Sequence, residues 1–192
     1  MADTKRTFIA VDLSPSVRAR FDELQRLLRP AGADVRWVKP DRAHLTLKFL
    51  GEATAEQIEA IEAALDEIAP ATAPFDVAFG GVGVFPNERR PRVLWTGITE
   101  GVEELRSLAA AIDARAEAAG FERERRGFSA HVTLGRFRSP SGWERLRELV
   151  GTNAAFDAGR LEAREVALIQ SILSPQGPTY APLHTARFGA GG

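Results

Sequence analysis

The pattern His-x-Thr-Leu occurs twice in this chain, and its repetition is the strongest constraint on the fold. The first copy is "RAHLTLKFLG" (Arg42–Gly51) and the second is "SAHVTLGRF" (Ser129–Phe137), with His131 following His44 by 87 positions. A repeat this long that occurs only twice is not a solenoid unit. We therefore predict an internal duplication, with repeats at about 6–86 and 92–174 and a closing strand at 180–188. Chance similarity between segments of mixed helix and strand is the alternative.

Each half of the chain has the same order of predicted elements: strand, helix, strand, strand, helix, strand. Short apolar runs rich in β-forming residues alternate with amphipathic segments of helical period. Ser14 and Pro15 predict the first helix start, and two capping-box patterns, Thr54 with Gln57 and Ser141 with Glu144, predict two more. A further edge strand is predicted at Phe121–Arg125. The pattern favours two similar α+β lobes in one domain that spans residues 1–192.

Composition excludes several classes of function. The chain has 192 residues and no cysteine, so disulfides, thiolate nucleophiles and zinc–thiolate sites are ruled out. The net charge of −1 gives no global basic field for holding long nucleic acids. No apolar run approaches the about 20 residues that a membrane-spanning helix needs, and residues 1–6 do not form a signal peptide. We expect a cytoplasmic protein without a membrane partner.

The two repeated segments are predicted strands with one polar face. Side chains alternate along a strand, so simple alternation places His44, Thr46 and Lys48 on one face, and His131 and Thr133 together on another. A polar face opposite apolar residues is costly unless it borders a wet cleft or finds partners. Two such strands related by a two-fold axis would present both histidines and both threonines to one shared groove.

This set of side chains suits an in-line displacement at phosphorus. One neutral histidine can deprotonate water while a protonated one protonates the leaving oxygen. Threonine hydroxyls two residues further on can bind the non-bridging phosphoryl oxygens. No metal-binding motif accompanies either histidine, so neither a metal nor a cofactor is expected. A single His-x-Thr on a strand is usually structural, and His184, which has no counterpart in the repeat, is interpreted as structural or incidental.

The segments "HLTLKFLG" and "HVTLGR" resemble the paired motifs of the two-histidine phosphoesterase superfamily, and more narrowly its RNA 2′,3′-cyclic phosphodiesterases, the 2′-5′ RNA ligase family. The resemblance extends over nearly the whole chain. It implies a bilobal fold of two antiparallel sheets with outer helices and a central groove. It also implies metal-independent hydrolysis of a terminal 2′,3′-cyclic phosphate to a 2′-phosphomonoester.

The resemblance assigns roles that the residues alone leave open. It makes His44 the proton donor and His131 the proton acceptor, and it places Thr46 and Thr133 on the phosphate-binding threonines. Many relatives have proline before the second histidine, where this chain has Ala130.

Four further residues are candidates for substrate binding. They are Lys48, Arg126, Phe128 and Arg136. The arginines suit phosphate oxygens and the phenylalanine could stack on a base, although a solvated charged edge strand explains most of the basic cluster better. Simple alternation puts Arg136 on the apolar face of its strand.

The predicted substrates are RNA ends or cyclic nucleotides, bound by a monomer because both histidines come from one chain. Two alternatives stay open. The same acid and base could join RNA ends in a 2′-5′ linkage, which is the reverse reaction. A non-catalytic nucleotide- or RNA-binding module is the other, although such a relative would be expected to have lost one of the four motif residues.

Overall fold

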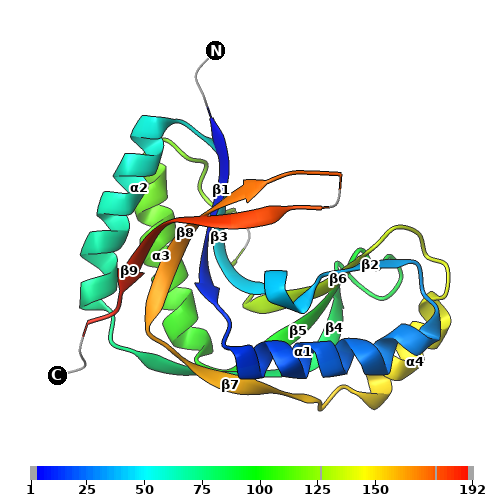
Figure 1. Cartoon of the computed structure of the whole chain (residues 1–192). Coiled ribbons are helices and arrows are strands. Elements are labelled where there is room, and N and C mark those ends of the chain that lie inside the picture. Colours follow the sequence, from blue (N-terminus) through cyan, green and yellow to red (C-terminus); the bar gives the residue numbers. More distant parts are fainter. Residues whose placement is uncertain (1–3, 126, 176, 190–192) are drawn as a thin grey trace.

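The computed structural model describes residues 4–125, 127–175 and 177–189, which form two antiparallel sheets with helices packed outside them (Figure 1). The first sheet has the strand order β3-β1-β8-β9 and the second has the order β2-β6-β5-β4-β7. The α+β class and the two antiparallel sheets are as predicted from the sequence.

The strands in chain order are β1 (Lys5–Asp12), β2 (Val35–Trp37), β3 (His44–Ala53), β4 (Phe75–Phe85), β5 (Val93–Glu100), β6 (His131–Phe137), β7 (Asp157–Ala163), β8 (Glu165–Ile172) and β9 (Thr179–Arg187). The helices are α1 (Pro15–Leu28), α2 (Ala55–Ile68), α3 (Val102–Ala118) and α4 (Trp143–Thr152), with 3-10 turns η1 (Arg29–Ala31), η2 (Pro40–Arg42) and η3 (Ala69–Ala71). None of the helices in the described ranges is long and apolar enough to cross a membrane.

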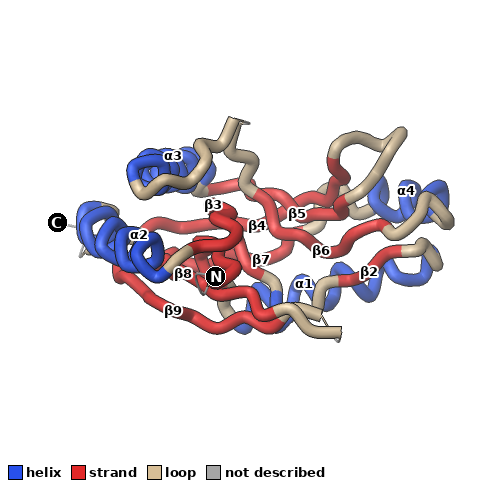
Figure 2. The backbone as a smooth tube through the Cα atoms, turned by 90° about the horizontal axis from the view of Figure 1, so that it is seen from above, coloured by secondary structure: helices blue, strands red, loops and turns tan. Residues whose placement is uncertain are grey.

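Helices α1 and α3 are exchanged between the two sheets. Helix α1 follows β1 of the first sheet but packs against β7 of the second sheet and against α4. Helix α3 follows β5 of the second sheet but packs against β3 of the first sheet and against α2. The pairs α2–α3 and α1–α4 therefore lie at opposite ends of the molecule (Figure 2). Each sheet is therefore covered in part by a helix that follows a strand of the other sheet in the chain.

Local sequence signals explain two helix starts and fail at a third. The Ser14 side chain accepts a hydrogen bond from the Val17 amide at the start of α1, and Thr54 with Gln57 forms the predicted reciprocal capping box. The capping box predicted from Ser141 and Glu144 is wrong. Helix α4 instead begins after Gly142, whose φ of 75° only glycine adopts easily, and no side chain caps it.

The structure differs from the predicted strands at two places. Residues Phe121–Arg125 lie in an extended loop rather than in a strand, and their contacts go to the Lys48 side chain and to α3. Strand β7 was missed because its sequence "DAGRLEA" contains glycine and few β-forming residues. It is an edge strand, so only β4 pairs with it.

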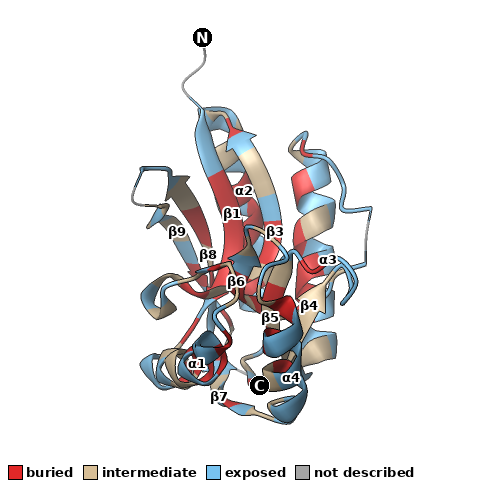
Figure 3. Cartoon of the chain, turned by 90° about the vertical axis from the view of Figure 1, so that its right-hand side faces the viewer, coloured by how far each residue is buried: buried red, intermediate tan, exposed pale blue. Residues whose placement is uncertain are grey.

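Buried apolar side chains form one large cluster and one small one. The large cluster fills the space between the sheets and the outer helices, and Figure 3 shows buried positions concentrated along the strands, β1 among them. The small cluster contains Phe8, Ala10 and Ile169, with Ala167 and Tyr180 against it. Alternation along β1 places Phe8 and Ala10 on the face opposite Ile9 and Val11, which belong to the large cluster.

Candidate active site

The two repeated motifs lie on neighbouring strands of different sheets. Strand β3 is the edge of the first sheet, β6 lies between β2 and β5 in the second, and β3 and β6 are in contact. His44 is the first residue of β3 and His131 is the first residue of β6. The fold thus brings into contact the two strands that begin with these histidines, although the histidines are far apart in the sequence.

Both strands contain the same irregularity, one residue after the motif threonine. On β3, Thr46 faces Ala10 and Lys48 faces Ile9, so Leu47 is an extra residue without its own partner. On β6, Thr133 faces Trp95 and Gly135 faces Leu94, so Leu134 is the extra residue. A bulge of this kind shifts the alternation of side chains by one position.

The bulge moves Lys48 off the face that carries His44. Lys48 is only 7% exposed, and its ammonium donates to Asp113 on α3 and to the Glu122 carbonyl at 2.9 Å. The prediction that Lys48 shares the face of His44 is therefore wrong. Phe49, the next residue, is 66% exposed and lies close to the Phe8 ring, on the histidine side of the first sheet.

The same shift places Arg136 on the face of His131. Arg136 is exposed, whereas Gly135 before it is buried against Val35 of β2. The charge of Arg136 acts on His44, His131 and Tyr180 alike. Simple alternation had put this guanidinium on the apolar face, and the bulge at Leu134 is the reason that expectation fails.

The two histidine rings are held in the same way. Nδ1 of His44 lies 3.0 Å from the Arg42 carbonyl, and Nδ1 of His131 lies 2.7 Å from the Ser129 carbonyl, in each case the residue two positions earlier. Because a carbonyl oxygen only accepts, each Nδ1 must carry the proton and donate it. In the neutral ring the Nε2 atom is then the free base.

Aromatic rings fix the orientation of both imidazoles. The His44 ring stacks on Phe8, with centroids 4.5 Å apart, and meets Tyr180 edge-on at 5.0 Å. The His131 ring meets Phe85 edge-on, also at 5.0 Å. With one nitrogen hydrogen-bonded and the ring faces packed, each imidazole presents Nε2 in a defined direction.

Burial lowers the pKa of both histidines. For His44 this effect is opposed by the hydrogen bond to Arg42 and by the charge of Asp12, while the charges of Arg18 and Arg136 act in the same direction as burial. For His131 burial also dominates, the bond to the Ser129 carbonyl opposes it, and Arg136 again lowers the pKa. Both rings therefore favour the neutral form more than a free histidine does.

The two histidines differ in their nearest carboxylate. Asp12 lies directly opposite His44 in the β1–β3 ladder, whereas Gly97 occupies the position opposite His131 in the β5–β6 ladder. The charge of Asp12 raises the pKa of His44 and does not act on His131. Arg18, which also acts on His44 and not on His131, works in the opposite direction, so Asp12 supports a second proton on His44 but does not outweigh burial.

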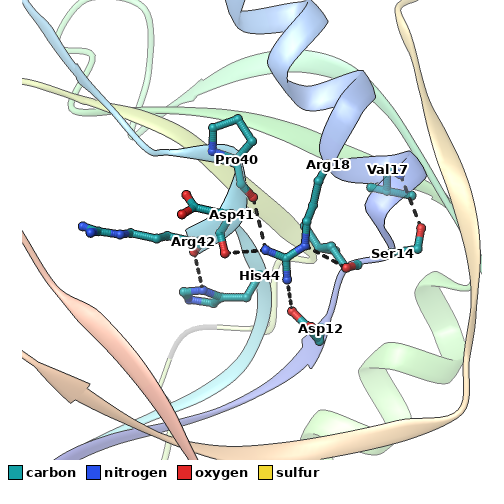
Figure 4. Close-up of polar contacts among 9 residues, drawn as sticks. Asp12, Ser14, Val17, Arg18, Pro40, Asp41, Arg42 and His44 are labelled. Atoms are coloured by element: carbon teal, nitrogen blue, oxygen red, sulfur yellow. Dashed lines mark hydrogen bonds and ion pairs between the residues drawn. The ribbon is translucent and has the colours of Figure 1, made fainter.

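Arg18 on α1 holds the segment that precedes His44 (Figure 4). Its guanidinium donates to the Leu13 carbonyl at 2.9 Å, to the carbonyls of Pro40 and Asp41, and to the Asp12 carboxylate. This network ties the end of β1 to η2, whose Arg42 carbonyl fixes the imidazole. Sequence reasoning missed both Asp12 and Arg18, because no local pattern links them to His44.

Both motif threonines are half-buried, and their hydroxyls have no hydrogen-bond partner among the described residues. Thr46 is two positions after His44 and Thr133 two after His131, so alternation places each hydroxyl on the face of its histidine. A hydroxyl in this situation can donate to a ligand oxygen without first breaking an internal bond.

The other residues singled out from the sequence are Phe128, Arg126 and His184. Phe128 is half-buried against the large apolar cluster, in the loop that leads to His131. Arg126 lies outside the described residues. His184 lies on β9, opposite Leu168 of β8, and not on the strands of the other two histidines. Its Nε2 atom is 2.7 Å from the Asp66 carboxylate on α2. This contact joins β9 to α2, which is consistent with a structural role for His184.

No group of three or more His, Asp or Glu side chains in the described ranges is arranged to hold a metal ion. Two surface cavities, of about 1020 and 640 Å³, lie at α4 and beside β7, and neither is lined by His44 or His131. The shared groove expected from the sequence therefore stays a prediction, supported by the contact between β3 and β6 and by the action of Arg136 on both rings.

Comparison with known proteins finds a family match over two segments of the chain. A family model described as LigT like phosphoesterase matches residues 11–95 and 97–180. An RNA 2′,3′-cyclic phosphodiesterase of Methanothermobacter thermautotrophicus is 35% identical, with 95% of this chain and 98% of that protein covered. The protein of the same name from Archaeoglobus fulgidus is 36% identical, with coverage of 93% and 97%.

Solved structures agree with the fold. A crystal structure of a Thermus thermophilus protein superposes with a TM-score of 0.81 at 30% identity, covering 96% of this chain and 98% of that one. The structure of E. coli LigT complexed with 3′-AMP gives 0.78 at 25% identity, covering 97% and 99%. With family matches over both halves and relatives above 30% identity along nearly its whole length, this chain belongs to the LigT-like phosphoesterase family.

Proposed function

We propose that this chain is a metal-independent RNA 2′,3′-cyclic phosphodiesterase. The observation that carries the proposal is the matched pair of imidazoles, each with Nδ1 bonded to the carbonyl two residues earlier and each followed by a free threonine hydroxyl. The relatives that bear the same name and cover nearly the whole chain support it. The 3′-AMP bound to E. coli LigT supports a nucleotide ligand.

In the proposed reaction, Nε2 of His131 takes a proton from water as the water oxygen attacks phosphorus. The bond from phosphorus to the 3′ oxygen breaks, and His44 gives its proton to that oxygen. The products are a 2′-phosphomonoester and a 3′-hydroxyl. The nearby Asp12 carboxylate, which raises the pKa of His44, supports this division of roles.

The charge that develops on the phosphoryl oxygens needs fixed donors. Thr46 and Thr133 supply neutral hydroxyls from the two strands, and Arg136 supplies a positive charge that both imidazoles experience. The anionic substrate would in turn raise the pKa of both histidines by its negative charge, which helps His44 to remain protonated in the complex.

We also propose that the chain acts as a single domain over residues 1–192, as a monomer and in the cytoplasm, on RNA ends or cyclic nucleotides. Both histidines, both threonines and Arg136 come from one chain, so no second copy is needed to complete the site.

The test uses an oligonucleotide that ends in a 2′,3′-cyclic phosphate, with excess chelator present. His44→Ala and His131→Ala should each abolish turnover, and His184→Ala is the matched control, because that ring bonds Asp66 and should not affect the reaction. Phosphorus NMR should show the phosphate on the 2′ oxygen. Near wild-type rates in either of the first two variants, or a strict need for metal, would contradict the mechanism.

Two other outcomes would favour the alternatives. Tight binding of cyclic-ended RNA with no turnover would favour a binding module. Joining of paired RNA fragments at rates above hydrolysis would favour a 2′-5′ ligase in the same site.

A further inference from the structure

Two arginines face each other across the β2–β6 pair. Arg36 of β2 lies directly opposite Arg136 of β6, and both side chains are exposed. Side chains of directly paired residues lie on the same face of a sheet, and like charges in that position repel. No carboxylate among the described residues forms an ion pair with either guanidinium. The proposed reaction uses Arg136, but it gives Arg36 no task.

Two more arginines gather near the same place. The positive charges of Arg136, Arg42, Arg36 and Arg6 all act on the Tyr180 phenol, where they oppose the effect of burial, which raises its pKa. Arg6, Arg36 and Arg136 come from strands of both sheets, and Arg42 comes from η2. Tyr180 itself stands edge-on to the His44 ring. The excess positive charge is therefore concentrated around Tyr180, whose ring packs against the ring of His44.

Arg42 has a defined position within this group. Its carbonyl holds the His44 ring, while its side chain points away from Arg18 (Figure 4). Its Nη1 atom lies 3.1 Å from the point where a Cβ on Gly177 would stand, so the guanidinium reaches the connection between β8 and β9. Arg42 and Arg36 thus approach the Tyr180 side of the site from different segments.

A terminal 2′,3′-cyclic phosphate carries a single negative charge. The two threonines and Arg136 can bind it, which leaves Arg36 and Arg42 without an anion. The next phosphate along an RNA strand is the one on the 5′ oxygen of the same terminal nucleoside. Guanidinium groups bind phosphate oxygens with paired hydrogen bonds and keep their charge at every working pH, so they suit that second phosphate.

We propose that Arg36 and Arg42, beside Tyr180, form a second anion subsite that binds the 5′-phosphate of the terminal nucleoside. This inference rests on the proposed function, since it takes the cyclic phosphate to lie between the histidines. It narrows the substrate class to cyclic-ended RNA, or to cyclic nucleotides that also carry a 5′-phosphate, in preference to plain nucleoside cyclic phosphates.

The kinetic test compares three substrates: adenosine 2′,3′-cyclic phosphate, its 5′-phosphorylated form, and a cyclic-ended dinucleotide. The native chain should prefer the latter two by about tenfold in kcat/KM, the effect of one strong charge-assisted contact. In Arg36→Gln and Arg42→Gln this ratio should fall toward one. Arg138→Gln, an exposed arginine that does not act on Tyr180, is the control and should keep the ratio.

A binding measurement keeps the subsite testable even without turnover. Titration calorimetry would compare adenosine 2′-monophosphate with adenosine 2′,5′-bisphosphate, which are the products expected from the first two substrates. The bisphosphate should bind about tenfold more tightly to the native chain and should lose this advantage in both variants. An equal affinity of the native chain for the two, or an advantage that survives in the variants, would overturn the subsite. Absence of turnover on all three substrates would instead count against the proposed function.

Discussion

Lys48 on β3 and Asp113 on α3 form an ion pair at the back of the strand that carries His44, and their side chains alone are only 6% and 16% exposed. Asp113 also accepts from the Glu124 amide at 3.1 Å, and Lys48 also donates to the Glu122 carbonyl. The pair therefore fixes the start of the loop that leads from α3 to His131. A residue of the first motif helps to position the segment before the second.

Replacing Lys48 by Met should destabilise the protein by about 3 kcal/mol, because Asp113 would keep a partly buried charge without its partner. Chemical denaturation measures this loss. The double variant Lys48→Met/Asp113→Leu should recover part of it, since both charges are then removed. A raised KM with unchanged stability would show instead that Lys48 binds substrate.

The pH profile of kcat/KM should peak below pH 6.5, the ordinary histidine value. For one acid and one base, the optimum lies midway between the two pKa values of the free enzyme, and both are lowered here. Arg136→Gln should move the optimum to higher pH, because the positive charge of Arg136 lowers the pKa of both rings. Arg138→Gln should leave the optimum in place. An optimum that does not move in Arg136→Gln would contradict the electrostatic role.

Asp12→Asn should lower the pKa of His44 further and leave that of His131 unchanged. The carboxylate of Asp12 raises the pKa of His44, and its removal leaves burial and the arginine charges with less opposition. NMR titration of the two imidazole rings measures both values in one experiment. Asp41→Asn is the matched control, since only the carbonyl of Asp41 takes part in the Arg18 network. A parallel shift of both rings would point to a general structural change.

Gly135→Val should destabilise the protein by about 1–3 kcal/mol. A Cβ at this position would stand 2.4 Å from Cγ1 of Val35, so β2 would have to move away from β6. Thermal unfolding would detect the change, and Val35→Ala in the same chain should relieve it. Gly151→Ala in α4, where nothing lies within 4 Å, should be neutral or stabilising. An equally small change in stability for Gly135→Val would show that β2 can shift away from β6 at little cost.

The motif residues could be singled out from the sequence alone, because repetition is a signal that needs no coordinates, and their roles stay predictions. His44 with Thr46 and His131 with Thr133 recur at matched positions, and a short-range pattern places each pair on one face of a strand. The fold class followed from alternating apolar periods. These inferences depend only on neighbours within a few positions along the chain.

What escaped prediction depends on contacts between distant segments. Alternation assumes a regular strand, and nothing in "HLTLKFL" reveals that the ladder with β1 leaves Leu47 without a partner, just before Lys48. Lys48 was misplaced for that reason. Asp12 and Arg18 meet His44 only through the tertiary network around η2, so they carried no local signal. Ser141 and Glu144 had a local signal, but the backbone of Gly142 begins the helix instead.

The bulge residue that follows each motif threonine also affects how sequence differences between related chains should be interpreted. The fourth position after each histidine, Lys48 or Gly135, packs inward against a helix or a strand. The fifth position, Phe49 or Arg136, is exposed on the face of the sheet that carries the histidine. Natural variation at the fourth position should therefore track growth temperature and resistance to unfolding, whereas variation at the fifth should track which RNA ends a given member processes.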